Sequence, residues 1–358
     1  MLSSLMRGSN KMNNLPKVIS IGFTAPPNSY TQRESFNSLG YPSRFWSIFN
    51  GAGITKRHLW VPIGTDLSWQ EAVEEYKKGA IYLSRKVIES CLDGRDPSTC
   101  GSVSFASCTG YECPSIIHHL AKEVGFSPDI VYTPILGTGC EGGFPALRRA
   151  YDYVVAHQKP SLAISCEICS VDFFPEDGAH PDTSNDYELL RANAIFGDGA
   201  SSVLVGFDND WRHPYIIDFE SYFDPDNMSH LGFVWQDGRL RCLLSRQVPK
   251  VAPLGAKVVV DKVLQRNELG VDGIAWWVIH PGGKAVLDNI RDVIGLPEEK
   301  LSMSREALRC YGNCSSSSIG IVGKLLMGRE IKPNDYIVVI SLGAGLAAGA
   351  TLLRFGGE

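Results

Sequence analysis

Cys140 is the residue whose type and surroundings best suit covalent chemistry. It lies in a glycine-rich stretch, residues 138–143, between a β-rich segment at residues 130–136 and apolar residues at helical spacing over residues 146–155. Unpaired N–H groups and the dipole at a helix N-terminus stabilise an anion, so a cysteine there favours its thiolate form. The glycines let another molecule approach the backbone closely. We therefore predict that Cys140 is a nucleophile.

A cysteine nucleophile needs a base or a cation beside it, and one histidine is suitably placed. Among eight histidines, His280 is the one that ends an apolar strand-like segment, residues 274–279, against a glycine turn. By position alone, a core or capping role for His280 fits as well as a catalytic one. Asn313 precedes a helix of small residues, where an N-cap is the simplest explanation. The thiol, imidazole and carboxamide indicate chemistry only as a set.

The order of predicted elements in the middle of the chain recurs in its last third. In the middle, a strand ends, a helix begins at Cys140 and a second strand follows. In the last third, a strand ends at His280, a helix begins near Asn313 and a second strand follows at nearly the same spacing. Matching order and spacing indicate two copies of one βαβ-type unit. Two such units packed together would bring these three residues to one central cleft.

A thiolate, an imidazole and a carboxamide in one pocket are suited to decarboxylative Claisen condensation. The thiolate accepts an acyl group from a thioester, and the neutral imidazole and the amide donate hydrogen bonds to the carbonyl oxygen of a malonyl thioester. These bonds stabilise the enolate left when carbon dioxide departs, and the enolate attacks the acyl-cysteine. No metal or organic cofactor is required. A papain-like protease uses the same three residue types, but the repeated βαβ layout and carboxylate-poor surroundings argue against it.

Composition and charge limit the remaining classes of function. The chain has 358 residues, 44% hydrophobic and 20% charged, which is typical of a globular protein with two halves or two domains. The net charge of −5 gives no reason to expect a nucleic acid as partner. No apolar run approaches the roughly 18 residues of a membrane helix, and the N-terminus lacks the apolar core of a signal peptide. We expect a cytoplasmic protein that binds neither nucleic acid nor membrane.

The ten cysteines are expected to be free thiols, because disulfides are uncommon in a large chain without an export signal. Cys166 and Cys169 form a CxxC pair inside a predicted strand, residues 162–169. Residues three apart on a strand face opposite sides, so these two thiols do not converge on a metal ion. No second CxxC pair completes a zinc site, and we predict no metal centre.

Several motifs together identify a family that the chain resembles. They are Gly139-Cys140, residues 196–200 (FGDGA), residues 280–288 (HPGGKAVLD) and residues 311–316 (YGNCSS). With them the sequence resembles the thiolase superfamily, specifically the type III polyketide synthases (chalcone-synthase-like) and the neighbouring ketoacyl-carrier-protein synthase III family. The resemblance implies an α/β, thiolase-like fold with two duplicated βαβ-type halves in a five-layer αβαβα sandwich. The halves would span residues 15–210 and 211–358, after a disordered tail at residues 1–14.

The resemblance also implies roles for particular residues. Cys140, His280 and Asn313 match the catalytic triad, and Phe196 matches a gatekeeper between the CoA tunnel and the cavity. Ser315 matches a cavity-lining position, and the loop from Gly343 to Gly345 would form an oxyanion hole with the backbone N–H of Cys140. Cys169 and Asp172 stand where plant enzymes carry cavity-lining threonines, which favours a bacterial-type acyl starter. Lys56 and Arg57 are expected to contact the CoA phosphates, although a solvated surface pair explains them equally well.

The function implied is that of a homodimeric acyltransferase of secondary metabolite biosynthesis. It would load an acyl group from acyl-CoA or an acyl-carrier protein on Cys140, extend it with malonyl-CoA and form a pyrone or phenolic ring. The alternatives are a single-round ketoacyl synthase, an enzyme that joins two acyl chains, and a non-catalytic scaffold partner. Glu141 is unusual beside a nucleophile, since its charge would raise the thiol pKa, and we predict that it points away from the sulfur.

Overall fold

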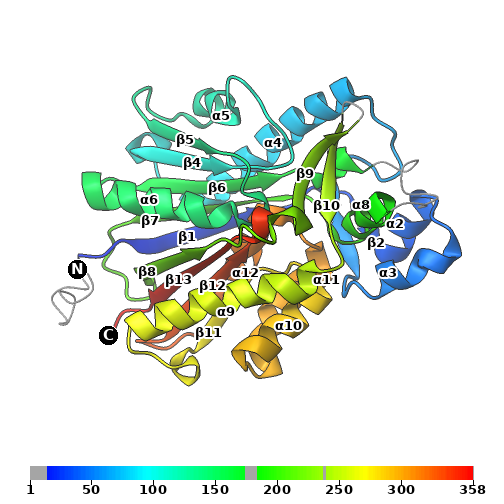
Figure 1. Cartoon of the computed structure of the whole chain (residues 1–358). Helices are drawn as coiled ribbons and strands as arrows, with labels where there is room; N and C mark the ends of the chain where they lie inside the picture. Colours follow the sequence, from blue (N-terminus) through cyan, green and yellow to red (C-terminus); the bar gives the residue numbers. More distant parts are fainter. Residues whose placement is uncertain (1–13, 174–183, 237–238, 358) are drawn as a thin grey trace.

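The structure is a computed structural model that describes residues 14–173, 184–236 and 239–357 (Figure 1). Within these ranges the centre is a mixed nine-stranded sheet with the order β11-β12-β13-β8-β1-β7-β6-β4-β5. Its strands are β1 (Lys17–Thr24), β4 (Ser102–Ala106), β5 (Val131–Ile135), β6 (Ser161–Glu167), β7 (Gly199–Gly206), β8 (Tyr215–Tyr222), β11 (Trp276–Ile279), β12 (Tyr336–Leu342) and β13 (Ala348–Arg354). The helices around it are α2 (Gln32–Ser38), α3 (Trp46–Asn50), α4 (Trp69–Leu92), α5 (Ile116–Val124), α6 (Gly143–His157), α8 (Ser184–Ile195), α9 (Val248–Arg266), α10 (Lys284–Ile294), α11 (Ser302–Tyr311) and α12 (Ser318–Leu326).

The two halves of the sheet have the same internal order, which confirms the predicted duplication. In the first half the order β4-β6-β7-β1 continues beyond β4 to β5, and in the second half the order is β11-β12-β13-β8. In each half the first two strands pair in parallel and the remaining neighbours pair antiparallel. One pair, Lys17 with Tyr215, joins the halves at the centre. The chain crosses from one half to the other between Gly206 and Tyr215.

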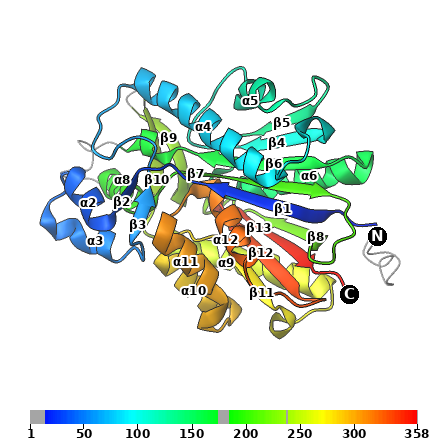
Figure 2. The same ribbon diagram turned by 180° about the vertical axis from the view of Figure 1, so that it is seen from behind.

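Hydrophobic clusters define the five layers of the predicted sandwich. One cluster packs α4 and α5 on the outer face of the first half, and another packs α9 and α10 on the outer face of the second half. A third cluster lies between the two halves and includes apolar side chains of α6 and α12. Figures 1 and 2 show α4 and α5 on one side of the molecule and α9 and α10 on the opposite side. Since each half of the sheet is covered on both faces, strands such as β6 are buried along their whole length.

Local signals explain where several elements begin and end. The N-terminus of α4 is closed by a capping box in which Ser68 and Glu71 bond each other's backbone N–H groups. Pro134 suits the position of β5 at the edge of the sheet, because proline has no N–H to donate to a further neighbour.

Smaller elements close one end of the sandwich. A β-hairpin of β9 (Leu231–Gln236) and β10 (Arg239–Leu244) stands beside α8, and β2 (Ser29–Thr31) pairs with β3 (Lys56–His58) near α2 and α3. No helix in the part of the chain that the structure describes is long and apolar enough to span a bilayer. The predicted disordered tail, residues 1–14, lies outside the described residues except for its last position.

Candidate active site

Cys140 lies in a tight turn between β5 and α6, as the sequence predicts. It is the middle residue of a short 3-10 turn, η4 (Gly139–Glu141), directly before α6. Gly139 has a φ of +57°, and a Cβ at this position would lie 2.8 Å from the Cβ of Ala344. Glycine is therefore needed here both for the backbone conformation and for the approach of the loop that follows β12. The turn holds the Cys140 side chain almost fully buried at 7% exposure.

The resting protonation state of Cys140 differs from the prediction. Burial raises the pKa of the thiol to about 11, although hydrogen bonds with Ser315 and Asn313 partly oppose this. The cost of removing a lone thiolate from water exceeds what the helix N-terminus supplies, so the isolated thiol stays protonated at neutral pH. The prediction of a favoured thiolate was wrong for the sulfur considered alone. Its proton must move to a neighbouring group during reaction.

His280 follows β11 and is held in place by its own backbone. Its N–H donates to the carbonyl oxygen of Ile340 at 2.9 Å, and its carbonyl accepts from Gly282 at 2.9 Å. The ring is buried, which lowers the pKa of the imidazole to about 4 and keeps it neutral near pH 7. Its Nδ1 has no hydrogen-bond partner among the described residues. A neutral, unpartnered imidazole is able to accept a proton or to bind a substrate group.

Asn313 is held by hydrogen bonds from its backbone N–H and to its side-chain oxygen. Its backbone N–H donates to Ile195 at 2.8 Å, and its side-chain Oδ1 accepts from the N–H of Ser315 at 2.9 Å and from Ser318 Oγ at 3.4 Å. These bonds occupy Oδ1, which leaves Nδ2 as the side-chain donor. The hydrogen bond from Asn313 that lowers the pKa of Cys140 is therefore a bond from Nδ2.

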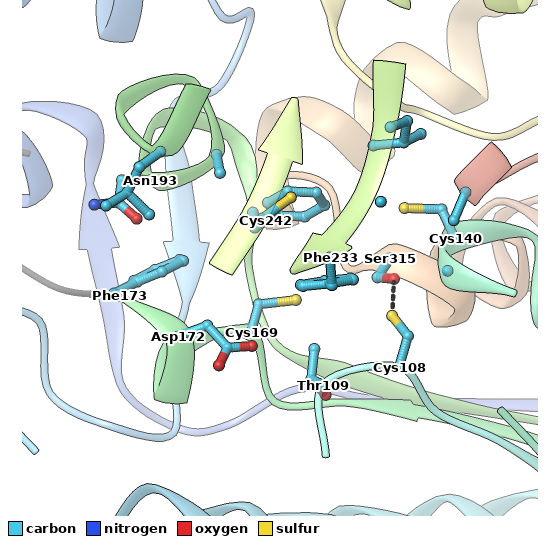
Figure 3. A pocket seen from close by; sticks show the side chains of 17 residues that line it. Cys108, Thr109, Cys140, Cys169, Asp172, Phe173, Asn193, Phe233, Cys242 and Ser315 are labelled. Carbon is cyan, nitrogen blue, oxygen red and sulfur yellow. Dashed lines mark hydrogen bonds between the residues drawn. The ribbon is translucent and has the colours of Figure 1, made fainter. Parts of the chain in front are cut away.

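The predicted triad meets at one buried cavity. Cys140, His280 and Asn313 line a cavity of about 30 Å³ together with Phe196 and Gly343. Cys140 also lines a second cavity of about 30 Å³, which Figure 3 shows. Three residues line both cavities, namely Cys140, Phe196 and Leu231. The nucleophile therefore faces two small chambers, and the Phe196 side chain forms part of the wall of each.

Most of the predicted substrate-binding residues line these two chambers. Cys169, Asp172 and Ser315 line the second chamber, where Figure 3 shows Cys140 and Ser315 on the side opposite Phe173. Gly343 lines the first chamber, whereas Gly345 lines neither. Burial and the charges of Asp198 and Glu167 hold the pKa of Asp172 well above its usual value.

The glycine loop after β12 packs directly against the nucleophile turn. A Cβ on Gly343 would lie 2.5 Å from the carbonyl oxygen of Thr138 and 2.5 Å from the Cβ of Glu141, so only glycine fits. Two N–H groups of the loop are engaged within the protein, that of Gly343 with Ala347 at 2.9 Å and that of Ala344 with Thr138 at 3.3 Å. The contribution of this loop to an oxyanion hole remains a prediction.

Glu141 packs against the glycine loop, as the Cβ contact with Gly343 shows. Burial raises the pKa of its carboxyl to about 7. The carboxylate whose charge raises the pKa of Cys140 is that of Glu167. That Glu141 points away from the sulfur stays a prediction.

The prediction that Arg57 contacts CoA phosphates was wrong. Its side chain is fully buried, and Nη1 donates to the carbonyl oxygens of Asn193 and Phe196 at 2.7 Å each. Burial lowers the pKa of the guanidinium to about 10, which the charge of Asp198 opposes. Arg57 therefore fixes the end of α8 and the backbone of Phe196. Lys56 is exposed beside it, and its contact with a phosphate stays a prediction.

Arg57→Met is expected to destabilise the protein by about 3–5 kcal/mol, because it leaves two buried carbonyl oxygens unpaired and Asp198 without its cation. Thermal and urea unfolding would measure the loss. Lys56→Met changes the neighbouring exposed residue in the same way and is expected to cost less than about 0.5 kcal/mol. Equal stability of the two variants would contradict the buried role of Arg57.

Glu167 is a positioning residue that the sequence did not reveal. It is fully buried at the end of β6, and its Oε2 accepts from the N–H groups of Cys108 and Thr109 at 3.0 and 3.2 Å. Its Oε1 accepts from Ser316 Oγ, three residues after Asn313. The carboxyl thus ties β4, β6 and the Asn313 turn together. Its sequence signal is an acidic residue inside an otherwise apolar strand, β6.

The β9–β10 hairpin also supplies lining that sequence reasoning did not assign. Leu231, Phe233 and Cys242 line the second chamber, as does Cys108 from the end of β4. The CxxC cysteines do not converge, since Cys166 packs in the outer cluster with α4 while Cys169 lines the chamber. The predicted strand over residues 162–169 was too long, because β6 ends at Glu167 and Cys169 begins the short turn that follows.

Comparisons with known proteins agree with this architecture. Residues 70–209 match the family described as "Chalcone and stilbene synthases, N-terminal domain", and residues 264–355 match "3-Oxoacyl-[acyl-carrier-protein (ACP)] synthase III C terminal". The chain is 30% identical to a "Putative chalcone synthase" of Bacillus subtilis, over 94% of this chain and 98% of that protein. It is 26% identical to the 3,5-dihydroxyphenylacetyl-CoA synthase of Streptomyces toyocaensis, over 95% of this chain and 90% of that protein. The crystal structure of 1,3,6,8-tetrahydroxynaphthalene synthase from Streptomyces coelicolor superposes with a TM-score of 0.87 at 21% identity, covering 96% of this chain and all of that one.

Proposed function

The chain belongs to the type III polyketide synthases, which are decarboxylating condensing acyltransferases, and we propose that Cys140, His280 and Asn313 carry out its chemistry. The observation that supports this assignment is the meeting of all three side chains at one buried cavity. The proposal assigns an acyl-CoA starter and malonyl-CoA as substrates, with no metal or organic cofactor. An acyl-carrier protein is the other possible donor of the starter.

In the loading step, His280 takes the proton of the Cys140 thiol as the sulfur attacks the thioester carbonyl of the starter. The C–S bond to CoA breaks, the acyl–Cys140 bond forms, and the proton passes from His280 to the departing CoA thiolate. Proton transfer between two neutral groups creates a cation beside the thiolate, which offsets part of the cost of burying the negative charge. Transfer of the proton to His280 therefore explains how a thiol with a raised pKa reacts near neutral pH.

In the extension step, the imidazole of His280 and Nδ2 of Asn313 donate hydrogen bonds to the thioester oxygen of malonyl-CoA. Carbon dioxide leaves, and the electron pair of the broken C–C bond forms an enolate that these two donors stabilise. The enolate carbon attacks the acyl carbon on Cys140, and the sulfur departs as thiolate. The low pKa of His280 suits this step, since the ring binds as a neutral donor near pH 7.

The proposal also covers the class of product, the oligomeric state and the cellular location. The named products of the relatives, 3,5-dihydroxyphenylacetyl-CoA and 1,3,6,8-tetrahydroxynaphthalene, are aromatic, which supports a phenolic ring or a pyrone for this chain. A homodimer is supported by the edge strand β5, where Val131, Tyr132 and the following Leu136 are about half exposed. A cytoplasmic location is supported by ten free thiols, which persist in a reducing compartment.

Incubation of the purified protein with acyl-CoA starters and malonyl-CoA tests the proposal. We expect release of free CoA, an acyl adduct on the peptide that contains Cys140, and products heavier than the starter by two or more malonyl-derived units. The absence of both CoA release and adduct would refute it.

A single-round ketoacyl synthase is the second candidate, because residues 264–355 match the ketoacyl synthase III C-terminal family. Products that contain one malonyl-derived unit from every starter would favour that activity. An enzyme that joins two acyl chains would incorporate no malonyl unit. Failure of Cys140 to react with a thiol-directed inhibitor would instead favour a scaffold protein without activity.

A further inference from the structure

The two chambers beside Cys140 are too small for the substrate that the proposed function requires. Each has a free volume of about 30 Å³, which is roughly the space of two water molecules. An acyl group that grows by malonyl units needs far more room. A cavity of about 680 Å³ lies directly next to the second chamber, and this volume falls within the range typical of small-molecule sites.

The large cavity and the second chamber share a wall of three side chains, Cys108, Thr109 and Asp172. Oδ2 of Asp172 is buried and has no hydrogen-bond partner among the described residues, so no bond from this atom resists its movement. Cys108 and Thr109 are held more firmly, since Cys108 Sγ contacts Glu167 at 3.4 Å and Thr109 Oγ1 donates to Glu167 at 3.0 Å. A movement of the Asp172 side chain would therefore be the simplest way to join the two spaces.

The lining of the large cavity is apolar and suits a hydrocarbon. Its wall on α4 consists of Trp69, Ala72, Val73 and Tyr76, and the other apolar contributors are Leu136, Val171, Trp235 and Leu240. Among the described residues, Asp172 is the one in this lining with a carboxyl group, and burial raises the pKa of that carboxyl above its usual value. No basic side chain lines this cavity within the described residues, so a phosphate or carboxylate ligand would lack a partner.

The cavity also opens to the surface. Trp69 and Trp235 are 58% and 77% exposed, and they come from α4 and β9, which approach each other at the top of Figure 1. Two exposed indoles on an apolar rim suit a chain that is buried along most of its length and emerges at its end. Because the cavity has an open end, a starter longer than the cavity would fit with its terminus outside.

We propose that this cavity binds the hydrocarbon chain of a medium- or long-chain acyl starter attached to Cys140. The proposal rests on the proposed function and defines its substrate class. The acyl carbonyl would lie at Cys140, and the chain would pass Cys108, Thr109 and Asp172 to reach the α4 wall.

The test compares kcat/KM for hexanoyl-, decanoyl- and palmitoyl-CoA with malonyl-CoA as extender, using the full-length protein. Burial of each added methylene is expected to raise kcat/KM about fourfold until the cavity is full. Ala72→Phe fills the α4 wall and is expected to lower the decanoyl-to-hexanoyl ratio of kcat/KM at least about tenfold. Ala156→Phe makes the same change at an exposed position on α6 that lines none of the three cavities, and it is expected to leave the ratio unchanged.

Each outcome of this test is decisive. If Ala72→Phe does not fold, Val73→Trp narrows the same wall from a position that is 44% exposed and should shift the ratio in the same direction. Condensation of short starters with no gain from a longer chain would overturn the inference while leaving the proposed function intact. No condensation with any starter would refute the proposed function itself. If Val73→Trp converts a dimer into monomers in sedimentation velocity and leaves the ratio unchanged, the cavity is an interface between two copies and the inference is wrong.

Discussion

Cys140→Ala is expected to lose acyl transfer completely, with a fall in kcat of more than about 10⁴-fold, because it removes the atom that carries the acyl group. The variant should nevertheless decarboxylate malonyl-CoA, since His280 and Asn313 remain in place. Intact-protein mass spectrometry would show no acyl adduct, and liberated carbon dioxide would measure the residual reaction. A loss of loading with retained decarboxylation separates the two steps of the mechanism.

Cys310→Ala is the matched control for this change. Cys310 is a free, partly exposed cysteine on α11 that lines neither of the chambers beside the triad. Its substitution should leave adduct formation and product yield unchanged. An acyl adduct on Cys108 in the Cys140→Ala protein would reassign the nucleophile, since Cys108 lines the second chamber.

Asn313→Ala is expected to lower the rate of malonyl-CoA decarboxylation about 10²- to 10³-fold, the usual effect of removing one donor to a developing oxyanion. Loading of the starter on Cys140 should persist, because His280 still accepts the thiol proton. His280→Ala should impair both reactions. Carbon dioxide release and adduct mass, measured on each variant, distinguish Asn313 as a hydrogen-bond donor from His280 as the base.

Ser318→Ala provides the control for Asn313. It removes only the 3.4 Å bond to Oδ1 and leaves the 2.9 Å bond from the Ser315 N–H, so decarboxylation should stay within about threefold of the wild type. Wild-type decarboxylation in Asn313→Ala would show that Nδ2 does not contact the thioester oxygen, and the role assigned to the amide would be wrong.

The sequence was sufficient to predict the fold and the meeting of Cys140, His280 and Asn313 at one cavity, because both follow from the order of elements. A strand end, a glycine turn and a helix start recur in each half, and the duplicated topology brings the turn between β5 and α6, the end of β11 and the residues after α11 to one cavity. Residues at such junctions have a position that depends little on side-chain packing. Cys140, His280 and Asn313 are all of this kind.

Properties that depend on burial were not predictable in the same way. Arg57 and Lys56 are adjacent basic residues in the sequence, yet one is fully buried and the other exposed, because only Arg57 faces the end of α8. The thiol pKa follows the same principle, since desolvation outweighs the helix terminus only once the sulfur is enclosed. The partition of the interior into two small chambers and a large cavity depends on the packing of the β9–β10 hairpin and α4, which no local pattern specifies.

The backbone bridge between Phe196 and Asn313 has a consequence for how such enzymes diversify. The amide of Phe196 donates to Ala192, its carbonyl accepts from Arg57, and the next amide, that of Gly197, donates to Asn313. Three hydrogen bonds hold the main chain at residues 196 and 197. A different side chain at position 196 would therefore change the shape of the wall between the two chambers without displacing the side-chain amide of Asn313. Evolution can therefore vary which molecules enter the site by substitution at position 196, while Asn313, bridged to that position, stays in place.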